Sequence, residues 1–459
     1  MSSLIMRAKP EEINTTEKRG KLGVCVIGCG QTGILQALLF AEAGFKVTCV
    51  DADQTILSRI DKGRAPFLRL EAGAKLKGHV KTGRLSATNE IRETVSQSDI
   101  IAITTPVKIS SKKKAEYSDL ENTCRKIGSS LQRGSLIIVT SLTGIGITEG
   151  LIKETLENTS GLKVGTDFGL AYSPIQTMHT RTWEEVANHQ RIVAAIDRDS
   201  LKAASIILET LTKRGVRRTG NVKAAELAAL LRVSQRDVNI ALANETALLC
   251  EKVGVDYSEA LEIIWTDTDS LPLTFTLADD SFSDDPYLLL EDSESFNVRP
   301  RLVTAARDTN EEAVKHVANL VKDALRSCGK TLKRARIALL GASQTPNVQS
   351  PIKRTAKKIV ETLEARGAKI SLYDPYLPEN EMAETPYHFK KTLTEAVERA
   401  DCIILVTAHD QFKHVNLRKM KLTMKMPAAI VDLEGVTEPS KIEKEGFVYR
   451  GLGRGVWTK

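Results

Sequence analysis

The sequence predicts an α/β protein with two doubly wound parallel sheets joined by one long central helix. Short runs of β-branched and aliphatic residues alternate with helical patterns at residues 24–220, and they do so again at 335–459. Such alternation is typical of βαβ units, in which helices cover both faces of a parallel sheet. Between these regions, residues 222–253 contain neither Gly nor Pro and repeat apolar residues every three or four positions. That spacing predicts a single uninterrupted helix.

The clearest functional signal is the run from Val24 to Asp53, where an apolar strand turns through three glycines into a helix and a second strand. Gly28 permits the tight turn, Gly30 lets a pyrophosphate approach the backbone, and Gly33 lets the helix pack closely on the strand. The order strand, Gly-x-Gly-x-x-Gly, helix, strand is typical of dinucleotide-binding Rossmann domains. It therefore predicts that the first sheet carries a dinucleotide.

Residues at the ends of the predicted strands and at the start of the first helix complete this cofactor site. Asp51 closes the second strand, where it can accept from a ribose 2′-OH and would repel a 2′-phosphate, so we predict NAD. Gln31 and Thr32 open the helix whose amides hold the phosphates. Thr105 and Ser141 follow two further strands, at the edge where doubly wound sheets bind ligands. An ordinary strand-turn-helix corner is the alternative, but the acid after the second strand favours NAD.

Composition argues for a soluble, reduced, cytoplasmic protein. No apolar run approaches the ~18 residues of a membrane span, and the N-terminus lacks the pattern of a signal peptide. The seven cysteines and seven histidines show neither disulfide nor metal-ligand spacing, so we expect no metal site. The net charge is +7, and the basic clusters at 112–114 and 418–425 contain few aromatic residues. We therefore predict no binding to nucleic acid or membranes.

Four regions are expected along the chain. Residues 1–21 read as a mobile polar tail, 22–220 as the NAD-binding Rossmann domain, 221–328 as a central helical region, and 329–459 as a second Rossmann-like domain. The first turn of the last domain lacks the glycine fingerprint, so no second NAD is assigned to it. A long helix with apolar residues on more than one side also predicts a homodimer through residues 222–253.

Several segments after the glycine run resemble the UDP-glucose/GDP-mannose dehydrogenase family, and the UDP-N-acetylmannosamine dehydrogenase branch looks nearest. The segments that carry the resemblance are Arg236–Glu245, Asp285–Leu288, Pro300–Asn310, Tyr373–Pro375, Thr407–Phe412 and Gly451–Gly455. The resemblance implies oxidation of the C6 alcohol of a nucleotide sugar such as a UDP-sugar to a carboxylate with two NAD, as in polysaccharide biosynthesis. It also implies a nucleotide-binding third domain and assigns substrate-binding roles to Arg236, Asn239 and Arg301.

The chain differs from this family at the positions of the family's catalytic residues. The family's thiol position is Ser281, and its lysine and asparagine positions on the long helix are Ala229 and Val233. A thiol is needed to carry an aldehyde through a thioester to the acid, and a cation and an amide stabilise the developing oxyanion. Ile175 and Leu142 replace a glutamate and a threonine of the family. We therefore assign no catalytic residue.

Two functions remain open at this point. The first is an NAD-dependent oxidoreductase on the CH–OH group of a UDP-sugar that has lost the four-electron oxidation. The second is a non-catalytic regulatory or partner subunit that binds NAD and a nucleotide sugar. An active enzyme with a thiol from elsewhere would need Cys250 or Cys328, which lie in helical patterns. The acidic stretch 267–294 is expected to be a solvated irregular loop rather than a metal site.

Overall fold

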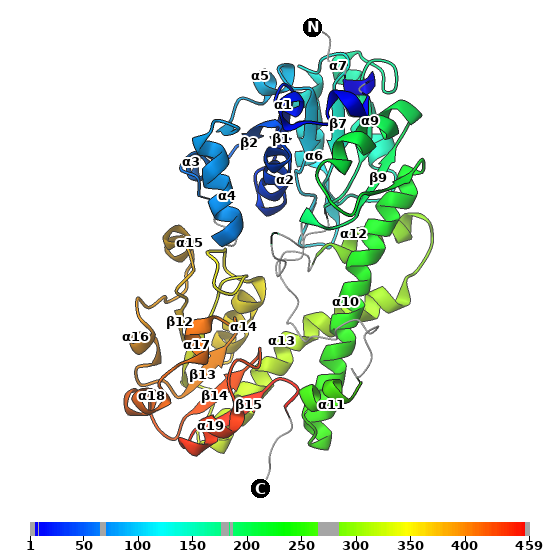
Figure 1. The fold of residues 1–459 in the computed structure, drawn as a ribbon. Helices are drawn as coiled ribbons and strands as arrows, with labels where there is room; N and C mark the ends of the chain where they lie inside the picture. The colour runs from blue at the N-terminus through cyan, green and yellow to red at the C-terminus, as the bar shows by residue number, and fades with distance from the viewer. Residues whose placement is uncertain are drawn as a thin grey trace. The chain divides into compact units, whose positions relative to one another are not determined.

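The structure is a computed structural model of the chain that describes residues 5–7, 9–64, 70–175, 183, 187–264 and 284–454 (Figure 1). These residues form two compact units. The first unit comprises Met1–Val233 and Tyr287–Arg299, and the second comprises Ser234–Pro286 and Pro300–Lys459. Each unit is built on its own sheet.

The first unit contains an eight-stranded sheet of order β10-β9-β8-β7-β4-β1-β2-β3. Neighbouring strands are parallel except β8 and β9, which are antiparallel. The strands are β1 (Gly23–Ile27), β2 (Lys46–Val50), β3 (Leu85–Thr88), β4 (Ile100–Ile103), β7 (Leu136–Val139), β8 (Gly169–Tyr172), β9 (Arg191–Ala195) and β10 (Val216–Thr219). A two-stranded hairpin, β5 (Lys108–Ile109) and β6 (Ala115–Glu116), lies outside this sheet.

Helices cover both faces of the first sheet, so its central strands β4, β7 and β8 are buried on both sides. Successive residues of β1 alternate between two hydrophobic clusters. Val26 packs in the same cluster as Leu38, and Ile27 in the same cluster as Leu120. The helices of this unit are α1 (Thr16–Arg19), α2 (Gln31–Glu42), α3 (Gln54–Asp61), α4 (Leu70–Lys81), α5 (Ile91–Ser96), α6 (Ser118–Gly128), α7 (Lys153–Ser160), α9 (Arg198–Glu209) and most of α12 (Pro286–Ser295).

The N-terminal segment differs from the expected mobile tail. In its described part, Ile5 and Ile13 are 2% and 3% exposed and belong to the cluster beneath α2. Arg19 donates to the carbonyl oxygens of Ile13 (2.7 Å) and Ala43. Two apolar side chains in a polar segment are enough to bring it into the core, because burying each one is favourable by roughly 1.5–3 kcal/mol.

The second unit contains a five-stranded parallel sheet of order β12-β11-β13-β14-β15. Its strands are β11 (Arg336–Leu340), β12 (Lys369–Tyr373), β13 (Cys402–Leu405), β14 (Ala429–Asp432) and β15 (Val448–Gly451). Its helices are α11 (Tyr257–Ile264), α13 (Arg301–Ser327), α14 (Arg354–Ala365), α15 (Glu379–Glu384), α16 (Leu393–Val397), α17 (Asp410–Lys413), α18 (Leu417–Thr423) and α19 (Pro439–Lys444). The strand order reverses at β11, so a ligand crevice is expected beyond the ends of β11 and β13.

The predicted long helix is present as α10 (Val222–Val253). Asn221 caps its start by accepting from the amide of Ala224 at 3.0 Å, and Gly254 follows its end with a positive φ of 75°. Both are ordinary helix boundary signals. The acidic stretch, in contrast, is not wholly irregular. Residues 265–283 lie outside the described part, but Pro286–Ser295 form helix α12.

A buried polar network joins α10 to α13 within the second unit. Arg307 donates to Asp237 Oδ1 at 2.6 Å, and Asn310 donates to the same oxygen at 2.9 Å. Asn244 in turn donates to Asn310 Oδ1 at 3.0 Å. All four side chains are about 95% buried. Burial raises the pKa of Asp237, and Arg307 and Asn310 partly offset that shift.

All seven cysteines are buried and free. Across residues 5–264 and 284–454, apart from the gaps given above, no helix is long and apolar enough to cross a membrane. In the same described residues, no three Cys, His, Asp or Glu side chains are grouped to hold a metal ion.

We predict that Arg307→Leu will lower the free energy of unfolding by about 3–5 kcal/mol, because it leaves the Asp237 carboxylate buried without its cation. Asp237→Leu combined with Arg307→Leu should cost less than Arg307→Leu alone, since no unpaired charge remains. Denaturant unfolding measures both. The control is Lys315→Ala, which removes an exposed ion pair with Glu312 and should change stability by less than about 0.5 kcal/mol. Equal losses for the single and double variants would contradict the prediction.

Candidate functional site

The glycine-rich turn between β1 and α2 has the geometry that a pyrophosphate requires. Gly28 has a φ of 94°, which favours glycine, and a Cβ on Gly33 would lie 1.8 Å from the Gly28 carbonyl oxygen. Gly30, the N-cap of α2, is exposed and has no heavy atom within 4 Å of the position of a Cβ. Gln31 and Thr32 begin the helix and are half-buried. The open helix N-terminus therefore fits an anionic ligand.

Asp51 is held at the end of β2 by backbone amides. Its Oδ2 accepts from Cys29 N–H at 2.5 Å and its Oδ1 from Asp53 N–H at 3.0 Å. The side chain remains half-buried rather than enclosed. Carboxylate oxygens have several acceptor sites each, so a ribose hydroxyl could still donate to Asp51. The structure thus fixes the orientation of Asp51, while its contact with ribose stays a prediction.

Thr105 and Ser141 lie at the carboxyl edge of the sheet, as expected, with different side-chain environments. Thr105 is half-buried, with its hydroxyl 3.3 Å from that of Thr123. Ser141 is 4% exposed and donates to the carbonyl oxygen of Ile103 at 3.2 Å, so it links β7 to β4. Thr104 was not predicted from the sequence to take part in this site. Its hydroxyl contacts the carbonyl oxygens of Ile27 and Gly28 and ties the glycine turn to β4.

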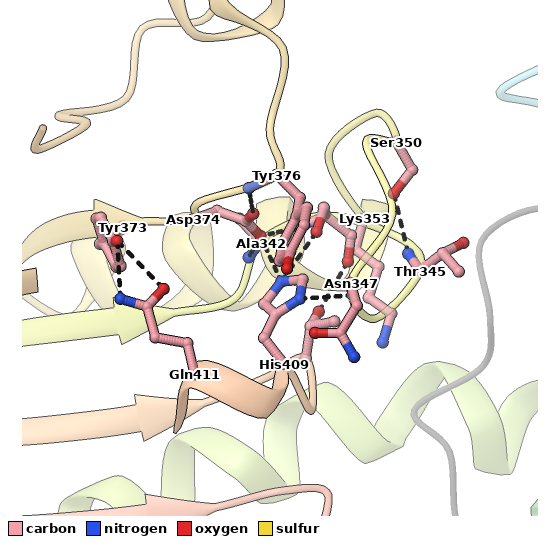
Figure 2. A network of polar contacts seen from close by, with 12 residues as sticks. Ala342, Thr345, Asn347, Ser350, Lys353, Tyr373, Asp374, Tyr376, His409 and Gln411 are labelled. Carbon is pink, nitrogen blue, oxygen red and sulfur yellow. Dashed lines mark hydrogen bonds and ion pairs between the residues drawn. The ribbon is translucent and has the colours of Figure 1, made fainter. Parts of the chain in front are cut away.

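The corresponding crevice of the second unit contains a buried histidine and aspartate (Figure 2). Asp374, at the end of β12, accepts through Oδ2 from the amides of Ala342 (2.6 Å) and Ser343 (2.7 Å). His409 Nδ1 accepts from Asn347 N–H at 2.9 Å, so Nε2 carries the proton of the neutral ring. That Nε2 lies 3.1 Å from Asp374 Oδ2 and donates to it.

These contacts shape both the charge and the packing of the crevice. Burial alone would raise the pKa of Asp374, but the hydrogen bonds from His409 and Ser343 outweigh it and lower the pKa. The ring of Tyr376 stacks on that of His409, with centroids 4.9 Å apart. Tyr376 N–H also donates to Asp374 Oδ1 at 2.7 Å. Both oxygens of Asp51 and of Asp374 accept from backbone amides, but Asp374 is only 6% exposed, so a ribose could not reach it.

A buried cation lies beside this network. Lys353, which precedes α14, is 7% exposed, and its Nζ lies 3.4 Å from Glu434 Oε1. Asn347 has a positive φ of 60° and donates through Nδ2 to Asp410 at 2.8 Å. The loop from 343 to 350 is thus held by Thr407 and His409, which lie between β13 and α17, and by Asp410 at the start of α17. Lys353 and the Tyr376 ring are groups suited to a nucleotide.

The three parts of the chain match three domains of one family. Residues 22–212 match the NAD binding domain, 223–312 the central domain and 338–439 the UDP binding domain of the UDP-glucose/GDP-mannose dehydrogenase family. A UDP-N-acetyl-D-mannosamine dehydrogenase of Pyrococcus horikoshii is 30% identical over 436 residues, which are 94% of this chain and 99% of the relative. The chain belongs to the UDP-glucose/GDP-mannose dehydrogenase family.

The similarity extends over nearly the whole chain in a solved structure and in a second sequence of this dehydrogenase family. The solved structure of the UDP-D-ManNAc dehydrogenase from Pyrococcus horikoshii has a TM-score of 0.84 at 29% identity and covers 95% of this chain and 100% of that one. A UDP-glucose 6-dehydrogenase of Rhizobium meliloti is 25% identical over 94% of this chain and 99% of its own. The predicted family, the fold of two Rossmann-like domains with a long central helix, and NAD as cofactor are confirmed.

The residues that the dehydrogenase family resemblance assigned to substrate are spread along two helices. Arg236 and Asn239 lie one turn apart on α10, both half-buried, and Arg301 is exposed at the first position of α13. Removal from water raises the pKa of Asp285 to about 7, the nearby Asp284 adds to the shift, and Arg236 opposes it. The charge of Arg236 therefore acts on the Asp285 carboxyl group, and the substrate roles of all three residues stay predictions.

The replaced positions are apolar where the structure describes them. Ala229 on α10 is fully buried, and Val233 one turn later is half-buried. Neither side chain can donate a hydrogen bond. Ser281 lies outside the described residues.

We predict that Asp51→Ala will weaken NAD binding by about 1–3 kcal/mol, because it removes the acceptor for the ribose and for Cys29 N–H. Isothermal titration calorimetry measures the change. Glu42→Gln, at the opposite end of α2, serves as the matched control and should bind NAD like wild type. Unchanged NAD affinity in Asp51→Ala would exclude Asp51 from the site.

We also predict a pH-dependent contribution of Asp374 to stability. Because its pKa in the folded protein is lowered from 3.8, the contribution is present above about pH 3.8 and is lost as the pH falls through the folded-state pKa. Asp374→Asn should therefore destabilise the protein at pH 6 and less so at pH 3. Unfolding midpoints at both pH values test this, with exposed Asp308→Asn as control. A pH-independent difference would contradict it.

Proposed function

We propose that this protein is an NAD-dependent oxidoreductase that acts on the CH–OH group of a UDP-sugar and does not carry out the four-electron oxidation to the uronic acid. The observation that supports this limit is the apolar character of Ala229 and Val233 on α10. The matches to the NAD binding and UDP binding domains support the two ligands. We also propose the expected division of the chain into three parts. These are an NAD-binding domain at 22–220, a central region at 221–328 and a nucleotide-sugar-binding domain at 329–459.

In this proposal the chain's own residues bind and orient the reactants. The glycine turn and the N-terminus of α2 hold the pyrophosphate, and Asp51 orients the adenosine ribose. Bound NAD supplies the hydride acceptor. In a two-electron step, one hydride would pass from the sugar carbon to NAD and the hydroxyl proton would pass to solvent, leaving an aldehyde.

The second oxidation requires more than the first. An aldehyde must be captured by a thiol before another hydride can leave, and the resulting thioester must be hydrolysed. Negative charge on oxygen also needs donors, and the loss of one such donor typically costs about 2.7–4 kcal/mol of transition-state stabilisation. Buried Ala229 and half-buried Val233 provide none. The alternative function, a non-catalytic NAD- and nucleotide-sugar-binding partner subunit, has the same ligands but no turnover.

We predict that wild-type protein, incubated with excess NAD and either UDP-N-acetylmannosamine or UDP-glucose, will form no uronic acid. Mass spectrometry of the sugar products and NADH absorbance test this. NADH with an aldehyde product supports the two-electron enzyme, whereas binding without NADH supports the partner subunit. Ser281→Cys alone should not restore acid formation, because Ala229 and Val233 still offer no oxyanion donor. Uronic acid at a rate typical of an enzyme would contradict the proposal.

We further propose that the protein is a homodimer that associates through α10. Leu242, Leu249 and Val253 are 50%, 61% and 61% exposed. Their spacing of seven and four residues places them on one face of the helix. Three large apolar side chains in one exposed row favour a protein partner over solvent.

Light scattering at micromolar concentration should therefore give the mass of a dimer. Leu242→Lys combined with Leu249→Lys should produce a monomer, because two charges would be buried in the interface. Leu422→Lys is the matched control, since Leu422 is 89% exposed on α18 and lies on a different helix. A monomeric wild-type protein, or a control variant that also dissociates, would contradict the role of α10.

A further inference from the structure

The loop Thr143–Thr148, which follows β7, is held by side chains from three distant elements of the first unit. Four of its backbone amides donate to Tyr117, Glu226 and Asp292, which come from the residue before α6, from α10 and from α12. The four bonds are Gly144 N to Tyr117 Oη (3.2 Å), Ile145 N to Asp292 Oδ2 (2.6 Å), Gly146 N to Glu226 Oε2 (2.6 Å) and Thr148 N to Glu226 Oε1 (2.9 Å).

Glu226 is buried, whereas Tyr117 and Asp292 are half-buried. Burial raises the pKa of Glu226. Burial also raises the pKa of Asp292, while its bond to Ile145 N–H opposes that shift. The pKa of Tyr117 is raised first by burial and then by the nearby Asp292. Carboxyl groups removed from water, in full or in part, are costly unless they are hydrogen-bonded, so the loop amides and these two acids constrain each other.

Close packing at Gly144 tightens this arrangement. A Cβ at Gly144 would lie 2.5 Å from Tyr117 Oη and 2.9 Å from Asp292 Oδ1. Both atoms are the ends of side chains that can rotate away. A methyl group at this position would therefore displace Tyr117 and Asp292 without disturbing the backbone of another element.

The sheet order places this loop at one end of the cofactor. β2, with Asp51 at its end, lies on one side of β1, whereas β4 and β7 lie on the other side. The pyrophosphate of a bound dinucleotide lies at the turn after β1. If the adenosine ribose lies at Asp51, the nicotinamide half must extend across the ends of β4 and β7. The loop Thr143–Thr148 is then next to the nicotinamide half.

We propose that Tyr117, Glu226 and Asp292 are positioning residues that hold the loop Thr143–Thr148 in the shape that receives the nicotinamide half of NAD. The inference rests on the NAD site of the proposed function and adds residues that lie outside the glycine motif. Glu226 and Asp292 both belong to residues 223–312, the segment that matches the central domain. The central segment thereby shapes the cofactor site of the NAD binding domain.

A purely structural role for the three side chains makes a different prediction. If they only stabilised the unit, their loss would affect every ligand of the glycine turn alike. If they position the nicotinamide end, their loss weakens the binding of NAD and leaves the binding of ADP unchanged, because ADP reaches only Asp51 and the glycine turn. The comparison of NAD with ADP therefore separates the two roles.

The experiment is calorimetric titration of full-length Gly144→Ala with NAD and with ADP. We expect NAD to bind about tenfold more weakly, since small misplacements of a positioning group have effects of this order, and ADP to bind as in wild type. Gly150→Ala is the matched control, because a Cβ at Gly150 meets no atom within 4 Å. It should bind both ligands normally.

Asp292→Ala provides an independent variant, with Glu294→Ala as its control. Glu294 lies on the same helix but pairs with Lys114 rather than with the loop. We expect Asp292→Ala to weaken the binding of NAD but not that of ADP. In the Gly144→Ala background it should cause little further loss of NAD affinity, since both substitutions disrupt the same contact. Equal loss of affinity for NAD and ADP, or no loss for either, would overturn this inference but not the proposed cofactor site. A wild-type chain that binds ADP but not NAD would overturn the proposed cofactor site as well.

Discussion

The structure depends on one recurring interaction, in which a carboxylate accepts hydrogen bonds from backbone amides at the edge of a sheet. Turns that leave a parallel sheet expose amide groups that secondary structure does not satisfy, and such groups are costly when buried. Asp51 accepts from an amide of the glycine turn, and Asp374 accepts from amides of the turn after β11. Asp432 accepts from the amides of Val436 and Thr437, which follow β14, at 3.0 and 2.8 Å. Glu226 likewise accepts from two backbone amides of the loop after β7.

The two sheets use this interaction to different ends. Asp51 and Asp374 both follow the second strand of their sheet, and each accepts from the turn after the first strand. Asp51 stays half-exposed, so it can also serve a ligand. Asp374 is enclosed by Tyr376 and by His409, which donates to the same oxygen as the turn amides. One topology thus leaves a carboxylate accessible in the unit that matches the NAD binding domain and encloses the corresponding carboxylate in the unit that matches the UDP binding domain.

Helix α10 combines two surfaces with opposite chemistry. Asp237 and Asn244 are buried polar residues that bond to α13, whereas Leu249 and Val253 are exposed apolar residues. Buried polar pairs contribute little net stability but penalise alternative packings, because a slipped helix would leave them unpaired. The polar side therefore specifies how α10 packs in its own unit, and the apolar side remains available for a partner.

The sequence alone determined the features that depend on local patterns. The glycine turn, the acid after β2, the alternation of strands with helices and the bounds of α10 follow from periodicity and from residues with special backbone freedom. The family was also evident from short segments such as Thr407–Phe412. These features are encoded within a few residues of one another, so no long-range contact is needed to recognise them.

Only the tertiary structure decided which distant side chains meet. Tyr117, Glu226 and Asp292 are more than 60 residues apart from one another, yet they hold one short loop. The sequence predicts that the acidic stretch is solvated, but Asp292 accepts a hydrogen bond from the backbone amide of Ile145 in that loop. Likewise, Ile5 and Ile13 belong to the core although their segment is polar. Hydrogen bonds and burial of this kind depend on where the folded chain brings groups together, and neither spacing nor composition records that.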